Sequence, residues 1–383
     1  MKNIYEEVKT PYNYGILLSF SRVPREFDSD LVDNPNIFTI PHDKKYIYMT
    51  YVGHDGKGYR TGLARSKDFL SWEKLGKILE NGAQGAWDEF NTAGYIVRDH
   101  IWGDVPTAHK TKDDLYAMTY LASDKPGYEA GIKRAGVAFT SEIVNNGEPV
   151  EWNKYKCPVL DAEDRKHPYE NGIIWKLQAI YDSENKRYVG FYNASSEPEV
   201  MCQAYSKDLI CWEREKDNPV VSKGMDPGGN VWGETHNSDG DVVRIGDKWV
   251  MFYFSSSPYG IIDTFAVSYD MKKWQKSFIP LTERNETYSS QFAHKPCVFK
   301  KNGVVYHYYN AVGNEGRVIA LCTSVDLSIY KNAIAVTSDQ CDAVSYSKLQ
   351  YGVECVKNEL VKDKGNKADI LKALDILKSI YPI

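Results

Sequence analysis

The chain has 383 residues, of which 42% are hydrophobic and 26% are charged, and its formal net charge is −5. This apolar content excludes a mainly disordered chain, and the slightly acidic balance excludes the basic surface of a nucleic-acid-binding protein. The seven cysteines form no C-x-x-C pair, and every apolar run is shorter than the roughly 18 residues of a membrane span. We therefore expect a soluble cytoplasmic protein with reduced thiols and with no nucleic-acid or membrane partner.

A short motif recurs along the chain. The segment Ser66-Lys-Asp-Phe-Leu-Ser-Trp72 has counterparts at residues 206–212 and 268–274, and weaker copies begin at Ser141 and Ser324. Serine and aspartate at this spacing are typical of a turn, and each tryptophan is expected to pack between neighbouring units. Five copies at fairly regular intervals indicate a repeat architecture.

Strand-like segments precede each copy of the motif. An apolar segment and an aromatic-rich segment, separated by a short turn, occur in chain order at residues 36–40 and 46–51, 177–181 and 188–192, 241–245 and 249–253, and 297–300 and 304–309. Third segments run into the motif at residues 61–64, 136–139, 265–267 and 318–322. Three such strands and a fourth that ends the motif make one propeller blade.

We therefore predict an all-β fold, a five-bladed β-propeller over residues 1–340, with blades that begin near residues 33, 91, 174, 238 and 295. A pair of β-sandwiches is the alternative, but it does not explain the repeated motif. Residues 341–383 depart from the repeat. The apolar spacing over residues 368–381 predicts an amphipathic tail helix that packs on the outside of the propeller.

Polar residues introduce the first strand of each predicted blade, and these positions converge at one mouth of a propeller channel. Carboxylates that face each other across such a cleft suit glycoside hydrolysis, in which one donates a proton and another activates water. The candidate catalytic residues are Asp33, Glu89, Glu170 and Glu234. The candidate substrate-binding residues are Trp175, Lys176, Gln178, Trp232, His236, Asp239, His294 and Lys295. The histidine spacing matches no zinc motif, so no metal site is predicted.

The repeat and the Asp33-Asn-Pro35 start of the first blade resemble the five-bladed propeller glycosidases, namely glycoside hydrolase families 43, 32 and 68 and the related phosphorylases of family 130. This resemblance implies that Asp33 is the general base, although Asn34 separates it from Pro35. It also implies that Asp88 or Glu89 tunes the acid, that Glu170 or Glu234 is the acid, and that His294 is the channel histidine. It allows a channel-bound Ca2+, and no other cofactor is expected.

The prediction is an inverting, exo-acting glycoside hydrolase that removes a pentosyl residue, arabinofuranosyl or xylosyl, or a related sugar from short oligosaccharides. Asp33 is predicted to be the base and Glu234 the acid, with Glu170 as the substitute. Two alternatives stay open. One is an inverting phosphorylase, which Asn34, Lys176, His294 and Lys295 allow, and the other is a propeller that binds sugar without catalysis.

Overall fold

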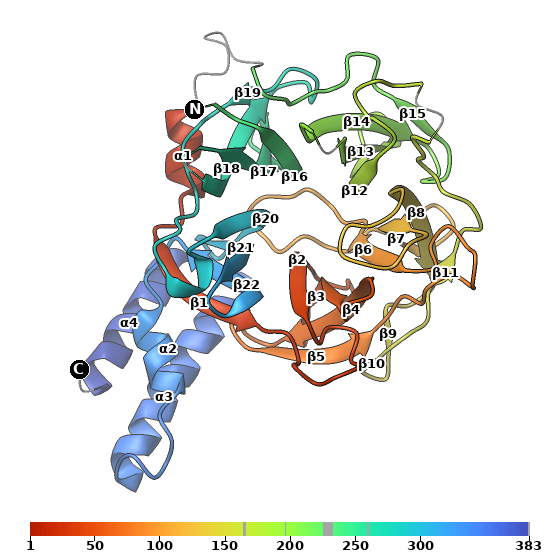
Figure 1. Cartoon of the computed structure of the whole chain (residues 1–383). Helices are drawn as coiled ribbons and strands as arrows, with labels where there is room; N and C mark the ends of the chain where they lie inside the picture. The colour runs from red at the N-terminus through yellow and green to blue at the C-terminus, as the bar shows by residue number, and fades with distance from the viewer. Residues whose placement is uncertain (164–165, 196, 225–232, 259, 382–383) are drawn as a thin grey trace.

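The computed structural model describes residues 1–383 except 164–165, 196, 225–232, 259 and 382–383. Strands hold far more of the described residues than helices do, which confirms the β-rich prediction, and the sheets are arranged around a common centre (Figure 1). Three antiparallel sheets have four strands each. They are β2 (Leu31–Phe38), β3 (Ile47–His54), β4 (Tyr59–Ser66) and β5 (Trp72–Lys77); β6 (Asn91–Ile96), β7 (Tyr116–Ser123), β8 (Arg134–Thr140) and β11 (Asn153–Lys154); and β12 (Ile174–Asp182), β13 (Arg187–Ala194), β14 (Val200–Ser206) and β15 (Trp212–Arg214).

An eight-stranded sheet contains two further antiparallel arrays, joined by a short parallel pairing of β18 with β20. The fourth array consists of β16 (His236–Ile245), β17 (Lys248–Ser257), β18 (Gly260–Ser268) and β19 (Gln275–Lys276). The fifth consists of β20 (Phe292–Lys301), β21 (Val304–Gly313), β22 (Gly316–Thr323) and β1 (Tyr12–Leu18), so that a strand near the N-terminus is the outer strand of the last array. The small hairpin β9 (Val144–Asn145) and β10 (Glu148–Pro149) and the short helices α1 (Lys2–Val8) and η1 (Thr287–Ser289) lie outside these arrays.

The repeated sequence motif forms the turn that leads into the outer strand. In the first copy, the Asp68 carboxylate accepts hydrogen bonds from the Ser66 hydroxyl and from the Leu70 and Ser71 backbone N–H groups. The Trp72 indole N–H then donates to the Phe69 carbonyl at 3.1 Å. Ser206 with Asp208 and Ser268 with Asp270 form the same turn. The motif is therefore structural, as its composition predicts.

A buried hydrogen-bond hub connects the arrays at the centre. The Arg98 guanidinium, just beyond the end of β6, donates to the Ile37 carbonyl at 2.8 Å and to the Asp241 carboxylate at 2.7 Å. Asp241 also accepts from the Gln178 amide at 2.7 Å and from the Val298 backbone N–H at 3.1 Å. Each of the five arrays contributes one of these residues. Gln178, which the sequence suggests as a sugar ligand, is thus buried in the hub, where it contributes to structure.

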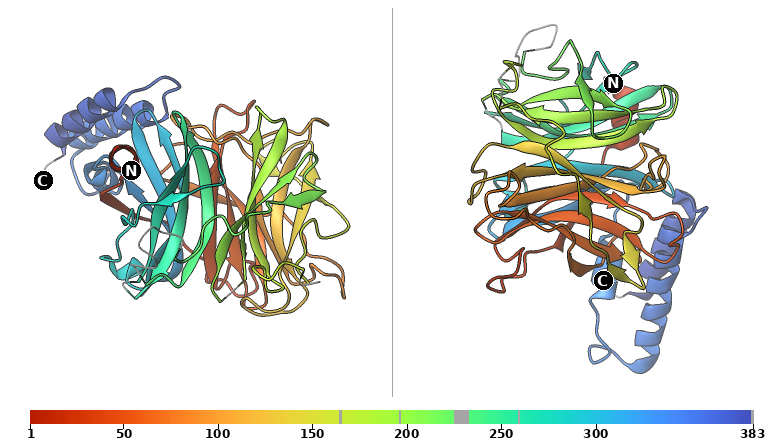
Figure 2. Two further views of the ribbon diagram at one scale, coloured as in Figure 1. Left: turned by 90° about the horizontal axis from the view of Figure 1, so that it is seen from above. Right: turned by 90° about the vertical axis from the view of Figure 1, so that its right-hand side faces the viewer.

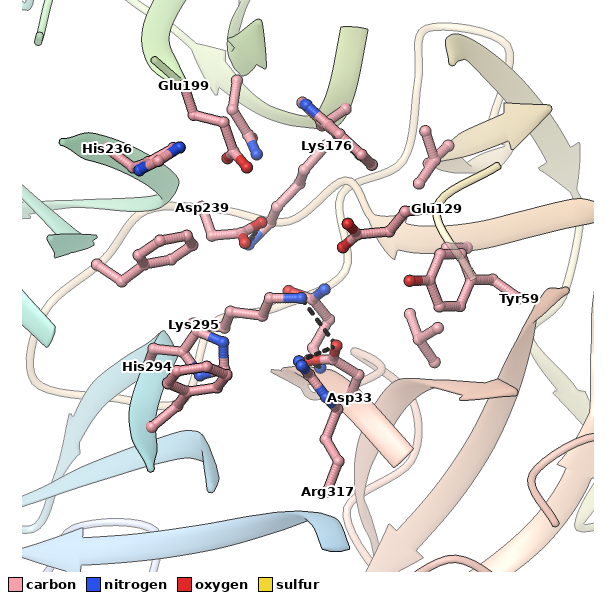
Figure 3. A pocket seen from close by; sticks show the side chains of 18 of the residues that line it. Asp33, Tyr59, Glu129, Lys176, Glu199, His236, Asp239, His294, Lys295 and Arg317 are labelled. Atoms are coloured by element: carbon pink, nitrogen blue, oxygen red, sulfur yellow. Dashed lines mark hydrogen bonds and ion pairs between the residues drawn. The ribbon is translucent and has the colours of Figure 1, made fainter. Parts of the chain in front are cut away.

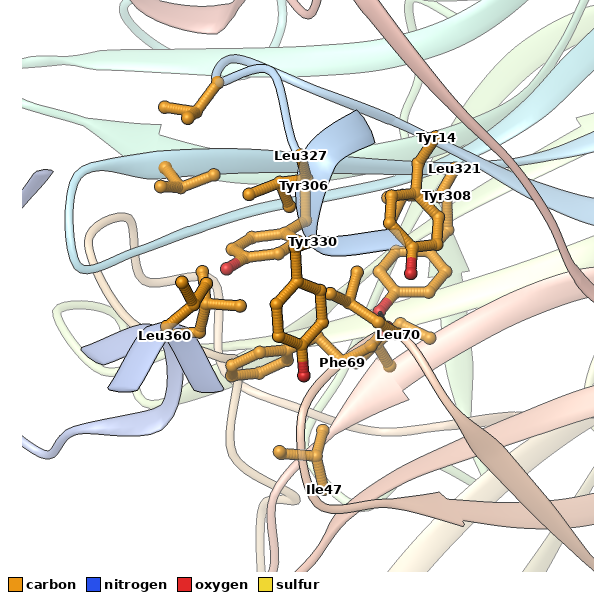
Figure 4. Close-up of a cluster of buried hydrophobic side chains, with 14 of the residues drawn as sticks. Tyr14, Ile47, Phe69, Leu70, Tyr306, Tyr308, Leu321, Leu327, Tyr330 and Leu360 are labelled. Carbon is orange, nitrogen blue, oxygen red and sulfur yellow. Dashed lines mark hydrogen bonds between the residues drawn. The ribbon is translucent and has the colours of Figure 1, made fainter. Parts of the chain in front are cut away.

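The C-terminal segment forms three helices, α2 (Ser328–Ile334), α3 (Ala343–Val361) and α4 (Lys367–Ile380). Figure 2 shows α3 and α4 as a hairpin beside the sheets. Leu360 and Tyr330 of this segment share a buried cluster with Phe69 of the first array and Tyr306 of the fifth (Figure 4). The helices therefore cover the place where the first and last arrays meet. Among the described residues, no helix is long and apolar enough to cross a membrane.

Candidate active site

A cavity of about 270 Å³ opens at the end of the arrays where the inner strands begin (Figure 3). Among the described residues, four carboxylates line it, from Asp33, Glu129, Glu199 and Asp239. Its cationic lining residues include Lys176, Lys295 and Arg317. Trp175, Tyr59 and Tyr95 contribute aromatic surface, and His236 and His294 contribute imidazole groups. The cavity therefore combines paired charges with apolar faces, as carbohydrate sites do.

The inner strands of four arrays are irregular where they enter this cavity. The pairing register shifts after Asp33 in β2, after Ile174 in β12, after Ser238 in β16 and after His294 in β20. Asp239 and Lys295 lie within these irregular segments with φ of 55° and 64°. A bulge of this kind reorients a side chain at the end of a sheet. This local geometry explains why Asp33, Lys176, Asp239 and Lys295 all line the cavity.

Asp33 is fixed as an anion. One carboxylate oxygen accepts the Asn34 backbone N–H at 2.7 Å, and the other accepts Lys295 Nζ at 2.8 Å and Arg317 Nη1 at 3.0 Å. Burial alone would raise the pKa of Asp33, but the charges of Lys295 and Arg317 hold this pKa well below its usual range. A carboxylate with both oxygens engaged in this way is a poor proton acceptor.

Glu199 has the opposite electrostatic environment. It lies between β13 and β14 and lines the cavity. Its pKa is raised to about 7, mainly by burial and further by the nearby Asp239 and Glu129 charges. A hydrogen bond with the Ser238 hydroxyl and the charge of Lys295 oppose this effect. Near neutral pH, Glu199 is therefore able to hold a proton and donate it.

Glu129 lies on the loop between β7 and β8, and its side chain is exposed at the cavity. Figure 3 shows the Glu129 and Glu199 carboxylates on opposite sides of the cavity, with Asp33 and its two cations below them in the view. Neither glutamate was predicted from the sequence. Both lie in loops that follow the second strand of an array, where the repeat pattern carries no signal. Arg317, in the third strand β22 of its array, was missed as well.

The structure brings seven of the residues predicted from the sequence into the cavity. They are Asp33, Trp175, Lys176, His236, Asp239, His294 and Lys295. His294 Nδ1 lies 3.1 Å from the Asn310 carbonyl oxygen, and burial, with the nearby Arg317 and Lys295 charges, lowers the pKa of His294 well below its ordinary value. His294 is therefore neutral at physiological pH and contacts the cavity as a hydrogen-bonding group.

Two of the other acidic candidates, Glu170 and Glu234, belong to an ion pair that recurs from array to array. Before the inner strand in four of the five arrays, an acid pairs with a cation from the outer strand of the same array: Asp28 with Lys74, Asp88 with Lys154, Glu170 with Arg214, and Glu234 with Lys276. In the first three, the acid also accepts a tyrosine hydroxyl from the second strand, from Tyr51, Tyr120 and Tyr192. The side chains of these acids are 1–6% exposed. Their repetition indicates a structural role.

The placement of these acids bears on the catalytic roles that the sequence predicts for them. Glu234 lines a separate cavity of about 390 Å³ and also accepts the Ser255 hydroxyl at 2.7 Å. Glu170 is buried against Arg214, at 2.6 Å. Glu89 lies in a turn, where it accepts the Gly85 backbone N–H at 2.7 Å. None of these three acids lines the 270 Å³ cavity, and their catalytic role stays a prediction from the sequence. Trp232, a predicted ligand, lies outside the described residues.

The structure also bears on the Ca2+ that the family resemblance allows. Within the described part of the chain, no group of three or more histidine, cysteine, aspartate or glutamate side chains has a geometry that could hold a metal ion. The buried Asp263 and His307 beneath the cavity bind each other, with 2.9 Å between Oδ2 and Nε2. The residues present therefore do not fit a channel metal, and no step of the chemistry below uses one.

Comparison with solved structures identifies the family. A solved structure of BT0996 in complex with RGII has a TM-score of 0.75 and 32% sequence identity, over 85% of this chain and 95% of its own. A structure named "Glycoside hydrolase" matches with the same score and identity and with 94% of its own length covered. The chain belongs to the glycoside hydrolases. An endo-arabinase from Bacteroides thetaiotaomicron VPI-5482 shares the fold at a TM-score of 0.55 and 13% identity, over 80% of this chain and 96% of its own.

No family model and no curated protein sequence matches the chain. A thermostable family-43 glycoside hydrolase also shares the fold, at a TM-score of 0.52 and 14% identity, over 82% of this chain and 91% of its own. This glycoside hydrolase therefore has the family-43-like fold that the sequence resemblance implies. Its main cavity lies at the strand ends where the fold gathers charged residues from all its arrays.

Proposed function

We propose that this glycoside hydrolase is an inverting, exo-acting enzyme that releases a pentosyl or related sugar from the end of an oligosaccharide. One observation carries the proposal. The cavity places Glu199, whose pKa is raised to about 7, across from Glu129, a water-exposed carboxylate on another array. A proton donor that faces a water-exposed carboxylate across a cavity is the arrangement that inverting glycoside hydrolysis requires.

The reaction follows from these positions. Glu199 donates its proton to the glycosidic oxygen as the bond between that oxygen and the anomeric carbon breaks. Glu129 removes a proton from a water molecule whose oxygen forms the new bond to the anomeric carbon from the opposite face. The products are a sugar of inverted configuration and the free hydroxyl of the remaining oligosaccharide, and the next cycle begins when the two carboxyl groups exchange the extra proton with solvent.

Asp33 has a different role in this proposal from the base role that the sequence resemblance implies. It binds two cations, Lys295 at 2.8 Å and Arg317 at 3.0 Å, so that it orients their remaining N–H groups toward the sugar hydroxyls. Asp239 lies near Glu199 and raises its pKa, which keeps the acid protonated. Trp175 supplies an aromatic face for a sugar ring.

The size of the cavity supports exo action on a small sugar. Its volume of about 270 Å³ is just below the roughly 300 Å³ at which pockets for drug-sized ligands begin. This volume suits one sugar unit. The complex of the 32%-identical BT0996 with RGII supports an oligosaccharide as the substrate. We also propose that the five arrays form a closed five-bladed propeller, with β1 as the outer strand of the last blade.

A phosphorylase would need a cationic site for phosphate. The cations that the sequence suggests for that role are already matched with carboxylates, because Lys295 binds Asp33 and Lys176 Nζ lies 3.9 Å from Asp239. This pairing favours water over phosphate as the acceptor.

The proposal is tested by incubating the protein with a panel of nitrophenyl pentosides and short oligosaccharides, with and without phosphate, and following the anomeric proton by NMR. We expect release of a free sugar of inverted configuration at a rate that does not depend on phosphate. A sugar 1-phosphate as the product would overturn hydrolysis, and a retained anomer would overturn inversion. Sugar binding without turnover across the panel would leave only the carbohydrate-binding function.

A further inference from the structure

We propose that Lys133 and Trp175 form a bridge that sets the spacing between the two catalytic loops, so that Lys133 is a positioning residue for the reaction. This inference rests on the proposed function, because it concerns the loops that carry Glu129 and Glu199. Lys133 was not suggested by the sequence, where it is one of many lysines.

The loop that carries Glu129 has an unusual backbone. Glu129 itself has φ of 53°, and the flanking Gly127 and Gly131 have φ of 115° and 76°. A non-glycine residue in the left-handed region costs free energy and persists only where surrounding contacts hold it. One such contact is the hydrogen bond from the Gly127 N–H to the Lys57 carbonyl at 2.6 Å, which ties the start of the loop to the first array.

Lys133 holds the other end of this loop. Its Nζ donates a hydrogen bond to the Glu129 backbone carbonyl. The same ammonium group lies 4.7 Å from the centre of the Trp175 ring, within the distance of a cation–π interaction. Lys133 is only 7% exposed, and burial lowers its pKa. A side chain buried at this cost, with its charge between a carbonyl and an aromatic ring, has one defined position.

Trp175 continues the connection to the acid. Its indole N–H donates to the Ser195 carbonyl at 2.6 Å. Ser195 directly follows β13, on the connection to β14 that also carries Glu199. The chain of contacts therefore runs from the backbone of Glu129, through Lys133 and the Trp175 ring, to the loop of the acid. It joins the second and third arrays across the cavity.

The spacing of the two carboxyl groups decides the chemistry. Inversion needs roughly 6.5–9.5 Å, which leaves room for a water molecule, whereas retention needs about 5–5.5 Å. A shift of about 1 Å in a catalytic group is enough to lower the rate about 100-fold. A bridge between the two loops therefore acts on kcat more than on substrate binding by the rest of the cavity.

The test compares Lys133→Met, Lys133→Arg and Trp175→Phe with a matched control, Lys331→Met. Lys331 lies in helix α2 and makes the same kinds of contact as Lys133. Its Nζ donates to the Tyr14 carbonyl at 2.6 Å and lies 5.5 Å from the centre of the Tyr14 ring. Lys133→Met is expected to lower kcat about 100-fold with KM within about threefold of the wild type. Lys133→Arg should restore most of the rate, because it keeps the charge and the donor.

Trp175→Phe keeps an aromatic ring and removes the indole N–H, so it should lower kcat as well, while Lys331→Met should leave kcat unchanged. Unchanged kcat in both Lys133→Met and Trp175→Phe, with Glu129→Gln and Glu199→Gln inactive, would overturn the bridge and leave the proposed function intact. Full activity in Glu129→Gln and Glu199→Gln would instead overturn the proposed function. If Lys133→Met does not fold, Lys133→Gln, which removes the charge but keeps a polar side chain, takes its place, and an unchanged kcat in that variant would overturn the bridge.

Discussion

The protonation of Glu199 makes a specific prediction about the pH dependence of catalysis. Burial and the neighbouring Asp239 charge raise the pKa of this carboxyl group to about 7. Because the protonated form donates the proton, about half of the enzyme is active at a pH equal to this pKa, and the active fraction falls about tenfold for each further pH unit. The value of kcat/KM should therefore decline above neutral pH.

Two variants should move this decline in opposite directions. Asp239→Asn removes a negative charge that raises the pKa of Glu199, so the loss of activity should begin at lower pH. Ser238→Ala removes a hydrogen bond that lowers the same pKa, so the loss should begin at higher pH. The two residues are adjacent in β16, which makes each a control for local disturbance by the other.

The assay is the pH profile of kcat/KM between about pH 5 and pH 9 for the wild type and both variants, since this ratio reports groups of the free enzyme. Profiles with the same basic limb in all three proteins would refute the assignment of Glu199 as the acid. A shift to higher pH in Asp239→Asn would refute the electrostatic reasoning as well.

Three further predictions follow from the contacts described above. Asp241→Asn leaves the buried Arg98 charge without its counterion and should lower the free energy of unfolding by about 3 kcal/mol, whereas Asp247→Asn, at an exposed pair, should change it by less than about 1 kcal/mol in urea denaturation. Asp33→Asn should lower kcat/KM about tenfold, mainly through KM, because Asp33 orients two cations; a loss as large as that of Glu129→Gln would restore Asp33 as the base. Trp175→Ala should raise KM about tenfold relative to Trp274→Ala, since only Trp175 of these two lines the cavity, and equal KM values would remove Trp175 from the sugar site.

The sequence was sufficient to predict the repeated four-stranded units and the end of the fold at which charged residues gather. Asp33, Lys176, Asp239 and Lys295 could be found because they interrupt the apolar pattern of the inner strands, and the structure shows that they lie at bulges there. The outer-strand role of residues 12–18 and the helix α3 were not predicted. The pairing of β1 with β22 leaves no local signal in the sequence, because the two strands lie far apart in the chain. The serine and tyrosine residues on the first turns of α3 obscure its helical pattern.

The same repetition that predicted the fold also directed the choice of the catalytic acid. Glu170 and Glu234 were chosen because polar residues cluster before the inner strands, yet this position recurs in four arrays as an acid paired with an outer-strand cation. A feature that recurs in each unit is more consistent with stabilising the unit than with chemistry that occurs once per molecule. Glu129 and Glu199 interrupt the repeat in single loops, and only the three-dimensional structure brings them to one cavity.

The most direct test of this account compares four isosteric variants on one substrate. Glu199→Gln and Glu129→Gln replace the two carboxyl groups proposed to be catalytic, and Glu234→Gln and Glu170→Gln replace two in ion pairs that recur between arrays. The account predicts that kcat/KM of the first two falls by about 100-fold or more, and that the folded fraction of the other two keeps most of its activity. Retained activity in Glu199→Gln together with its loss in Glu234→Gln or Glu170→Gln would contradict the account.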